Sequence, residues 1–71
     1  MKKYLTITEV ADLAGVHSDT VRRNYWRIEF AKNVPANEKS WLRRGEGVTS
    51  KLYLHRDVAV AMRDAYSIPT K

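Results

Sequence analysis

The chain has 71 residues, a formal net charge of +5 from 13 Lys and Arg against 8 Asp and Glu, and no cysteine. This length predicts one small domain over residues 1–71, with little volume for an enclosed catalytic pocket, so we do not expect an enzyme. The lack of thiols excludes a disulfide scaffold and thiolate-held zinc, and no apolar run approaches the roughly 20 residues that span a bilayer. We therefore expect a cytoplasmic protein without a cofactor or a membrane partner. The excess of positive charge favours a polyanion as the partner.

A first helix is predicted to begin after Thr6, because Thr6 and Glu9 have the spacing of a capping box. The segment 3–5 before it is interpreted as a short strand. Apolar residues at helical spacing continue to Ala14. Gly15 is expected to end this helix by adopting a left-handed conformation.

A second helix is predicted to begin after Ser18, with Ser18 as its N-cap, and to continue to about Lys32. Val21, Tyr25 and Ile28 follow the i, i+4, i+7 spacing of a buried stripe. The second helix is therefore expected to pack on the first helix through these three residues.

Two strands, 41–44 and a second within 48–54, are predicted to form a hairpin around Gly45-Glu46-Gly47. A last helix is predicted to open at Asp57 and to end at 67–69. Its apolar face is expected to consist of Val58, Ala61, Met62, Ala65 and Tyr66. Trp41, Tyr53 and Tyr66 are expected in the core. The predicted fold class is α+β, mainly α.

Ala11, Gly15 and Val21 have the spacing of a helix-turn-helix. A small residue at 11 allows close approach of the two helices, Gly15 makes the turn, and Val21 anchors the second helix. The remaining face of the second helix is then expected to enter the major groove of double-stranded DNA. The DNA-binding residues predicted on this recognition helix are Ser18, Asp19, Thr20, Arg22, Arg23 and Arg27.

Arginine in such a helix can bind guanine in bidentate fashion or hold a phosphate. We expect one of Arg22 and Arg23 to touch a base and the other to touch the backbone, with Ser18 and Thr20 suited to phosphate. Asn24 stands where this motif more often has an aliphatic residue, so three interpretations are open: Tyr25 replaces it in a rotated helix, Asn24 bonds adenine, or Asn24 is a partly exposed structural residue. The last is favoured. The alternative for the whole helix is an amphipathic helix with a solvated basic face.

Arg43, Arg44 and Lys51 flank the predicted hairpin tip. A basic hairpin beside a helix-turn-helix is expected to act as a DNA-binding wing that lies along a minor groove or the backbone. The alternative is an ordinary surface hairpin with solubilising charge. Trp26 is interpreted as a surface aromatic that packs on this hairpin or on a partner.

The two histidines lack a third ligand at suitable spacing, so we expect no metal site. His17 is expected in the turn, where its side chain can reach a phosphate. His55 is expected to cap or precede the last helix.

Two motifs give the chain a family resemblance: Thr20-Val21-Arg22-Arg23, and the Tyr-x-x-x-Asp-Val pattern from Tyr53 to Val58. Over roughly residues 5–66 the chain resembles the small phage and mobile-element excisionases, which share the MerR-like winged-helix fold with AlpA-like regulators. The stretch 28–40 is longer than the usual connection in that family.

The resemblance implies an architectural protein of a bacterial host cell that does no chemistry itself. It implies binding to repeated sites near an attachment site, head-to-tail self-association on DNA, and DNA bending that biases an integrase, a tyrosine or serine recombinase, toward excision. The first alternative is a phage or mobile-element transcriptional regulator that binds a promoter operator. Two further alternatives are a protein-interaction module that docks an acidic partner and the DNA-binding head of a terminase small subunit.

Overall fold

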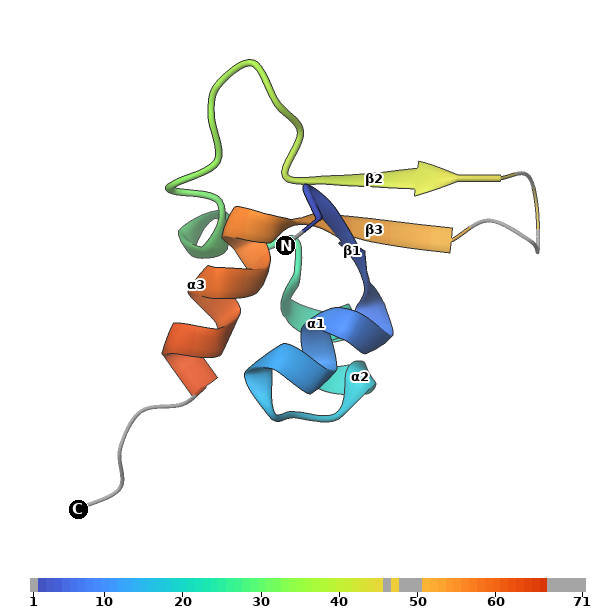
Figure 1. Ribbon diagram of the computed structural model, residues 1–71, viewed down its shortest axis with the longest axis vertical. Helices are drawn as coiled ribbons and strands as arrows, with labels where there is room; N and C mark the ends of the chain where they lie inside the picture. Colours follow the sequence, from blue (N-terminus) through green and yellow to red (C-terminus); the bar gives the residue numbers. More distant parts are fainter. Residues whose placement is uncertain (1, 46, 48–50, 67–71) are drawn as a thin grey trace.

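The computed structural model describes residues 2–45, 47 and 51–66. These residues form three α-helices, one 3-10 helix and a three-stranded antiparallel sheet, so the α+β class is confirmed at this level (Figure 1). The elements in chain order are β1 (Tyr4–Thr6), α1 (Ile7–Ala14), α2 (Ser18–Asn24), the 3-10 helix η1 (Ile28–Phe30), β2 (Trp41–Arg44), β3 (Lys51–His55) and α3 (Arg56–Tyr66).

The sheet has the strand order β1-β3-β2, with Leu5 opposite Leu54 and Arg43 opposite Leu52. The predicted hairpin is confirmed for β2 and for β3 from Lys51 onward, while the predicted positions 48–50 lie outside the described residues. The first strand begins one residue later than predicted and pairs with β3. In Figure 1 strands β2 and β3 extend away from the helices.

Helix α1 begins and ends as its sequence predicts. The Thr6 hydroxyl accepts a hydrogen bond from the Glu9 amide at 3.1 Å, and the Glu9 carboxylate accepts one from the Thr6 amide at 2.9 Å. At the other end Gly15 has φ 71° and ψ 32°, and its amide donates to the Ala11 carbonyl. The capping box and the left-handed glycine are therefore both confirmed.

Helix α2 differs from its prediction at both ends. His17, not Ser18, is the N-cap, since its Nδ1 accepts the Asp19 amide at 3.0 Å and the helix begins at Ser18. The prediction that the helix continues to about Lys32 is wrong, because α2 ends at Asn24. The Asn24 side-chain amide donates to the Thr20 carbonyl at 2.7 Å, a local bond of the kind that competes with continued helix.

The chain after α2 buries a different side chain from the one predicted. Ile28 is 86% exposed, so its place in a buried stripe is wrong, while Phe30 of η1 is only 6% exposed. The Phe30 ring packs on Tyr66 of α3, with ring centroids 6.0 Å apart. Because the α-helix ends at Asn24, the chain that follows can bury the large aromatic side chain of Phe30 in place of Ile28.

The core lies where the two first helices, the sheet and α3 meet. Its members are Leu5, Val10, Ala11, Val21, Phe30, Leu54, Val58, Ala59 and Met62. Trp41 is 39% exposed and stands edge-on to Tyr25, so its predicted core position is wrong. Tyr53 and Tyr66 are half-buried, and the predicted apolar face of α3 is wrong at Ala65, which is exposed.

The loop over residues 31–40 is attached to the sheet by a polar cluster around His55, whose side chain is 1% exposed. Its Nδ1 accepts the Asp57 amide at 3.0 Å, so the neutral ring carries its proton on Nε2 and donates to the Glu38 carboxylate at 2.6 Å. Lys3 also binds Glu38, and the Tyr4 hydroxyl donates to the Lys39 carbonyl. The prediction that His55 caps the last helix is confirmed, although α3 begins at Arg56, one residue before the predicted start. The predicted end at 67–69 lies outside the described residues.

Candidate nucleic-acid interface

The turn between α1 and α2 fixes how α2 is presented. Ala11 and Val21 are 4% and 0% exposed where the two helices pack, and Gly15 makes the tight connection. These three residues therefore take the structural positions that their spacing predicts. The opposite side of α2 remains open to solvent, with Arg22 and Arg23 exposed.

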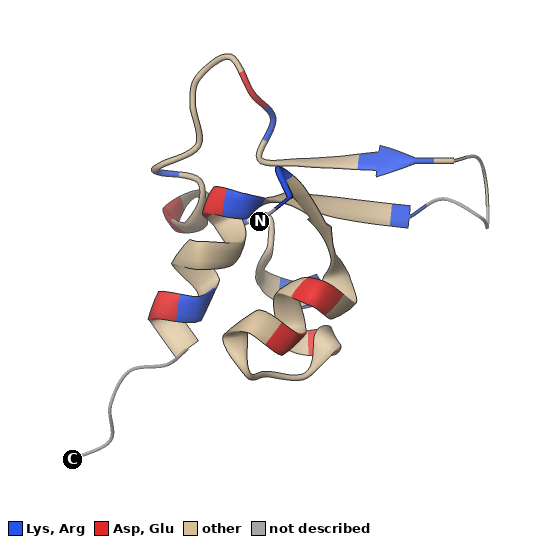
Figure 2. Cartoon of the chain, viewed as in Figure 1, with Lys and Arg blue, Asp and Glu red and all other residues tan. Residues whose placement is uncertain are grey.

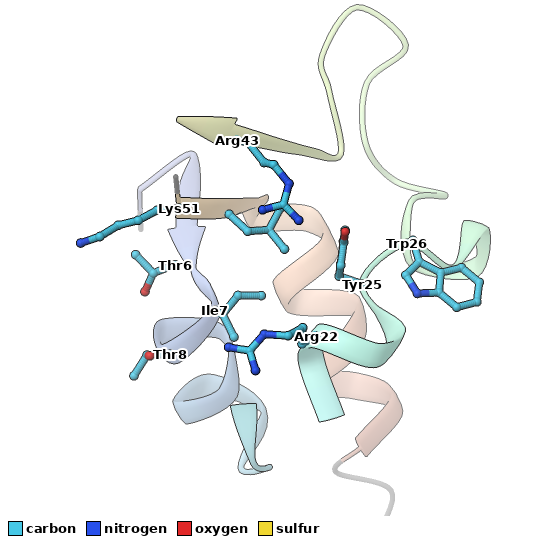
Figure 3. Close-up of a pocket in the computed structure, with 9 residues that line it drawn as sticks. Thr6, Ile7, Thr8, Arg22, Tyr25, Trp26, Arg43 and Lys51 are labelled. Atoms are coloured by element: carbon cyan, nitrogen blue, oxygen red, sulfur yellow. The ribbon is translucent and has the colours of Figure 1, made fainter. Parts of the chain in front are cut away.

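An open groove of about 640 Å³ lies between this helix pair and the hairpin (Figure 3). Three of its lining residues are cations from three segments: Arg22 of α2, Arg43 of β2 and Lys51 of β3. In Figure 3 Arg22 and Arg43 reach toward the same space, while the Lys51 ammonium points outward at the rim. No carboxylate is among the described residues that line it. We call it the basic groove.

The floor of the basic groove has a different chemistry from its rim. Ile7, Tyr25 and Leu52 contribute half-buried apolar or aromatic surface, and Thr6 and Thr8 add hydroxyl groups. Strand alternation explains part of this arrangement. Leu52 lies opposite Arg43 in the sheet, so the two side chains share the face that looks toward α1 and α2.

Of the residues predicted on α2, only Arg22 is among the described residues that line the groove. Arg22 forms an ion pair with Asp19 at 2.9 Å, with exposed fractions of 62% and 58%. An ion pair this exposed contributes little to stability, so Arg22 can exchange Asp19 for a phosphate at small cost. Arg23 is exposed and forms no ion pair with a described residue, whereas Ser18 and Thr20 are half-buried.

Arg27 lies beyond the end of α2, so its predicted place on this helix is wrong, and its neighbours hold it in position. Its Nε donates to the Asn24 side-chain oxygen at 2.7 Å, and its guanidinium lies 5.3 Å from the centroid of the Trp26 ring. Asn24 therefore bonds Thr20 and Arg27 within the chain, as the structural interpretation of this residue predicts. Trp26 is 59% exposed and lines the edge of the basic groove. Its exposure confirms the interpretation of Trp26 as a surface aromatic, and the structure adds its place at the groove.

The two adjacent arginines of β2 point to opposite faces of the sheet, as consecutive strand residues must. Arg43 lines the basic groove, but Arg44 lies over the ring of Tyr53, 6.0 Å from its centroid. The structure thus brings together Arg22 and Arg43 of the predicted set. Lys51 borders the groove at its rim, although the register places it opposite Arg44, on the other face of the hairpin.

Part of the positive charge lies apart from the acidic residues. Figure 2 shows Lys and Arg at the projecting end of the hairpin and Asp and Glu on α1. Elsewhere cations are neutralised, as in the Lys2–Glu9 pair at 2.7 Å. Hydrogen bonds from the Lys2 ammonium and the Thr6 amide hold the pKa of Glu9 below its ordinary value. Arg43 and Lys51, by contrast, form no ion pair with the residues that the structure describes.

The described residues contain no cluster of three His, Asp or Glu side chains suited to a metal ion, and no described helix is long and apolar enough to cross a membrane. Comparison with models of known protein families, with curated proteins and with solved structures found no match to this chain. The exposed cations and the basic groove are therefore the features from which function must be inferred. Their chemistry suits the binding of a polyanion.

Proposed function

We propose that this chain is a winged helix-turn-helix protein that binds double-stranded DNA with sequence specificity. The observation that carries the proposal is the convergence of Arg22 of α2 and Arg43 of β2 on one open groove, with Lys51 of β3 at its rim and no carboxylate among the described lining residues. In this arrangement α2 enters the major groove, and the hairpin lies along the backbone or the neighbouring minor groove.

The exposed arginines of α2 supply the contacts to base edges and to phosphates. Arg23 has no carboxylate partner among the described residues, and Arg22 has only an exposed one. Both guanidinium groups are exposed and can bind guanine edges or phosphates, Arg22 by exchanging its exposed partner Asp19. Arg27 is fixed beside the groove by Asn24 and Trp26 and adds a backbone contact.

Within this class we propose the role of an excisionase. The support is the resemblance of Thr20–Arg23 and Tyr53–Val58 to the excisionase motifs. A domain this small makes about four to six phosphate contacts, so its single-site affinity is modest and depends steeply on salt. Repeated sites near an attachment site, with head-to-tail contacts between molecules, would raise the effective concentration. The bound array would bend the DNA in the bacterial cytoplasm and bias an integrase toward excision.

The test is a binding-site selection with sheared DNA of the source element, followed by footprinting of the enriched fragments. Clustered repeats beside an integrase core site are the expected result. A single operator over a promoter would replace the excisionase role with that of a transcriptional regulator. No enrichment at low salt would overturn DNA binding itself. The variant with Arg22→Ala and Arg23→Ala is the matched control and should lose the enrichment.

A further inference from the structure

The basic groove has a cationic surface and an apolar surface, and a phosphodiester backbone that binds the first makes no favourable contact with the second. Its rim carries the cations of Arg22, Arg43 and Lys51, and its floor carries Ile7, Tyr25 and Leu52. Phosphates bind the rim through charge. They gain nothing from the floor, where half-buried apolar side chains remain in contact with water.

A ligand that satisfies both surfaces must be anionic and must also carry an apolar group. The groove volume of about 640 Å³ lies within the range of pockets that bind compact ligands. Its open form, between a helix pair and a projecting hairpin, admits an extended chain rather than enclosing a small molecule (Figure 3). The acidic side chains of such a chain would bind the cations at the rim, and an apolar side chain between them would cover Leu52 and Ile7.

We propose that the basic groove is also the docking site of an acidic peptide segment that carries an apolar residue, and that this segment competes with DNA for Arg22, Arg43 and Lys51. Charge complementarity selects the acidic character, because three cations and no carboxylate are among the described lining residues. The apolar floor selects the anchor residue. The competition with DNA rests on the proposed function, whereas peptide docking in the groove does not.

The first measurement uses a fluorescently labelled short peptide in which Glu and Leu alternate, with a peptide of equal length and charge in which Ser replaces Leu. The unmodified protein should bind the Glu–Leu peptide about tenfold more tightly than the Glu–Ser peptide, since only the first covers the floor. Equal binding of the two peptides, or no binding of either, would overturn the proposal.

Two leucines of the hairpin provide a matched pair of variants. Leu52 lines the groove, while Leu42 is half-buried on the neighbouring strand and does not line it. Leu52→Ala should weaken peptide binding by about tenfold, and Leu42→Ala should leave it unchanged. Equal losses in both variants would place the peptide elsewhere. Arg43→Ala should weaken the peptide and duplex DNA alike.

A measurement on the unmodified protein guards against a variant that fails to fold. In methyl NMR spectra the Glu–Leu peptide should shift the signals of Ile7 and Leu52, and the Glu–Ser peptide should not. Peptide binding without these shifts would contradict the docking site. Unlabelled duplex should displace the Glu–Leu peptide, and a ternary complex would overturn the competition. A duplex that does not bind even without peptide would refute the proposed function, and the variants and methyl signals would still decide the docking site.

Discussion

At position 15 the backbone has φ 71°, a conformation that an L side chain adopts only with strain. A Cβ built there meets no heavy atom within 4 Å, so the strain comes from the backbone alone. Gly15→Ala should therefore lower the free energy of unfolding by about 1–2 kcal/mol, measured by urea denaturation. Gly15→Asn is the control and should lose less, because asparagine tolerates this conformation. Equal stability of Gly15→Ala and wild type would mean that α1 does not end in a left-handed residue in solution.

Arg22 and Arg23 differ in their surroundings although they are adjacent and both exposed. Arg22 has Asp19 beside it, and Arg23 has no described ion-pair partner. Replacing either by Ala should weaken specific duplex binding by about 1–3 kcal/mol, measured by fluorescence anisotropy. The variant that loses affinity only for its specific site identifies the base reader, and the one that weakens all duplexes identifies the phosphate contact.

Lys32→Ala controls for the loss of one exposed charge, since Lys32 does not line the basic groove. It should change duplex affinity less than either α2 variant. Unaltered binding after both α2 substitutions would show that α2 does not read DNA.

The hairpin offers a comparison at the scale of an element, because Arg43 and Arg44 carry equal charge on opposite faces. A duplex that contacts both α2 and the hairpin lies on the face of Arg43, since Arg43 and Arg22 line the same groove. Arg43→Ala should weaken all duplexes similarly and reduce the slope of log K against log salt by about 1. Arg44→Ala should reduce it less, because Arg44 lies over Tyr53. Equal slopes for both variants and wild type would mean that the hairpin makes no DNA contact.

The loop over residues 31–40 should make stability depend on pH through Glu38. Hydrogen bonds from His55 and then from Lys3 hold the pKa of Glu38 below its ordinary value of 4.5. A carboxylate whose folded pKa is lowered stabilises the fold fully above its unfolded pKa, and this contribution is lost as the pH falls through the folded pKa. Thermal unfolding should thus show stability falling below about pH 4.5, with a shallower fall in Glu38→Gln.

Glu29→Gln controls for the removal of one negative charge, because Glu29 is exposed and forms no ion pair with the described residues. If Glu38→Gln follows the wild-type pH profile, the carboxylate of Glu38 does not attach the loop to the sheet in solution.

The ends of α1 could be predicted from sequence because their signals are local. Thr6 and Glu9 satisfy each other's backbone amides within one turn, and Gly15 relieves its own backbone strain. The end of α2 could not be predicted from sequence, because it depends on which of Ile28 and Phe30 packs into the core, and that is decided by contacts with distant residues. Helical spacing favours Ile28, but Phe30 reaches Tyr66, which is distant in sequence.

The candidate site shows the same division between local and distant signals. The types and order of its cations could be predicted from the sequence, and so could the turn that presents α2. The separation of Arg43 from Arg44 follows from strand alternation once the register is known. The exposure of Trp26 could be predicted, but its place at the groove could not, and the role of Glu38 depends on a contact with His55 that no local pattern encodes.

At the scale of the whole molecule, a net charge of +5 on 71 residues is distributed unevenly. Acidic residues neutralise cations around β1 and α1, as in the Lys2–Glu9 and Lys3–Glu38 pairs. Of the exposed cations of α2 and the hairpin, Arg22, Arg43 and Lys51 border the basic groove. The molecule therefore has one face on which a duplex can lie without meeting a lining carboxylate.

This arrangement predicts how duplex binding responds to salt. About four to six phosphate contacts by one molecule give a slope of log K against log salt of about −4 to −5, because each contact releases condensed counterions. Anisotropy titrations of a short duplex at several salt concentrations measure this slope. A slope near zero would contradict an electrostatic DNA interface. On longer duplexes with repeated sites the excisionase role predicts binding that becomes cooperative while the slope for each bound molecule stays the same, since contacts between molecules add no phosphates. A slope that steepens for each added molecule would contradict this prediction, since each further molecule would then contact more phosphates than the first.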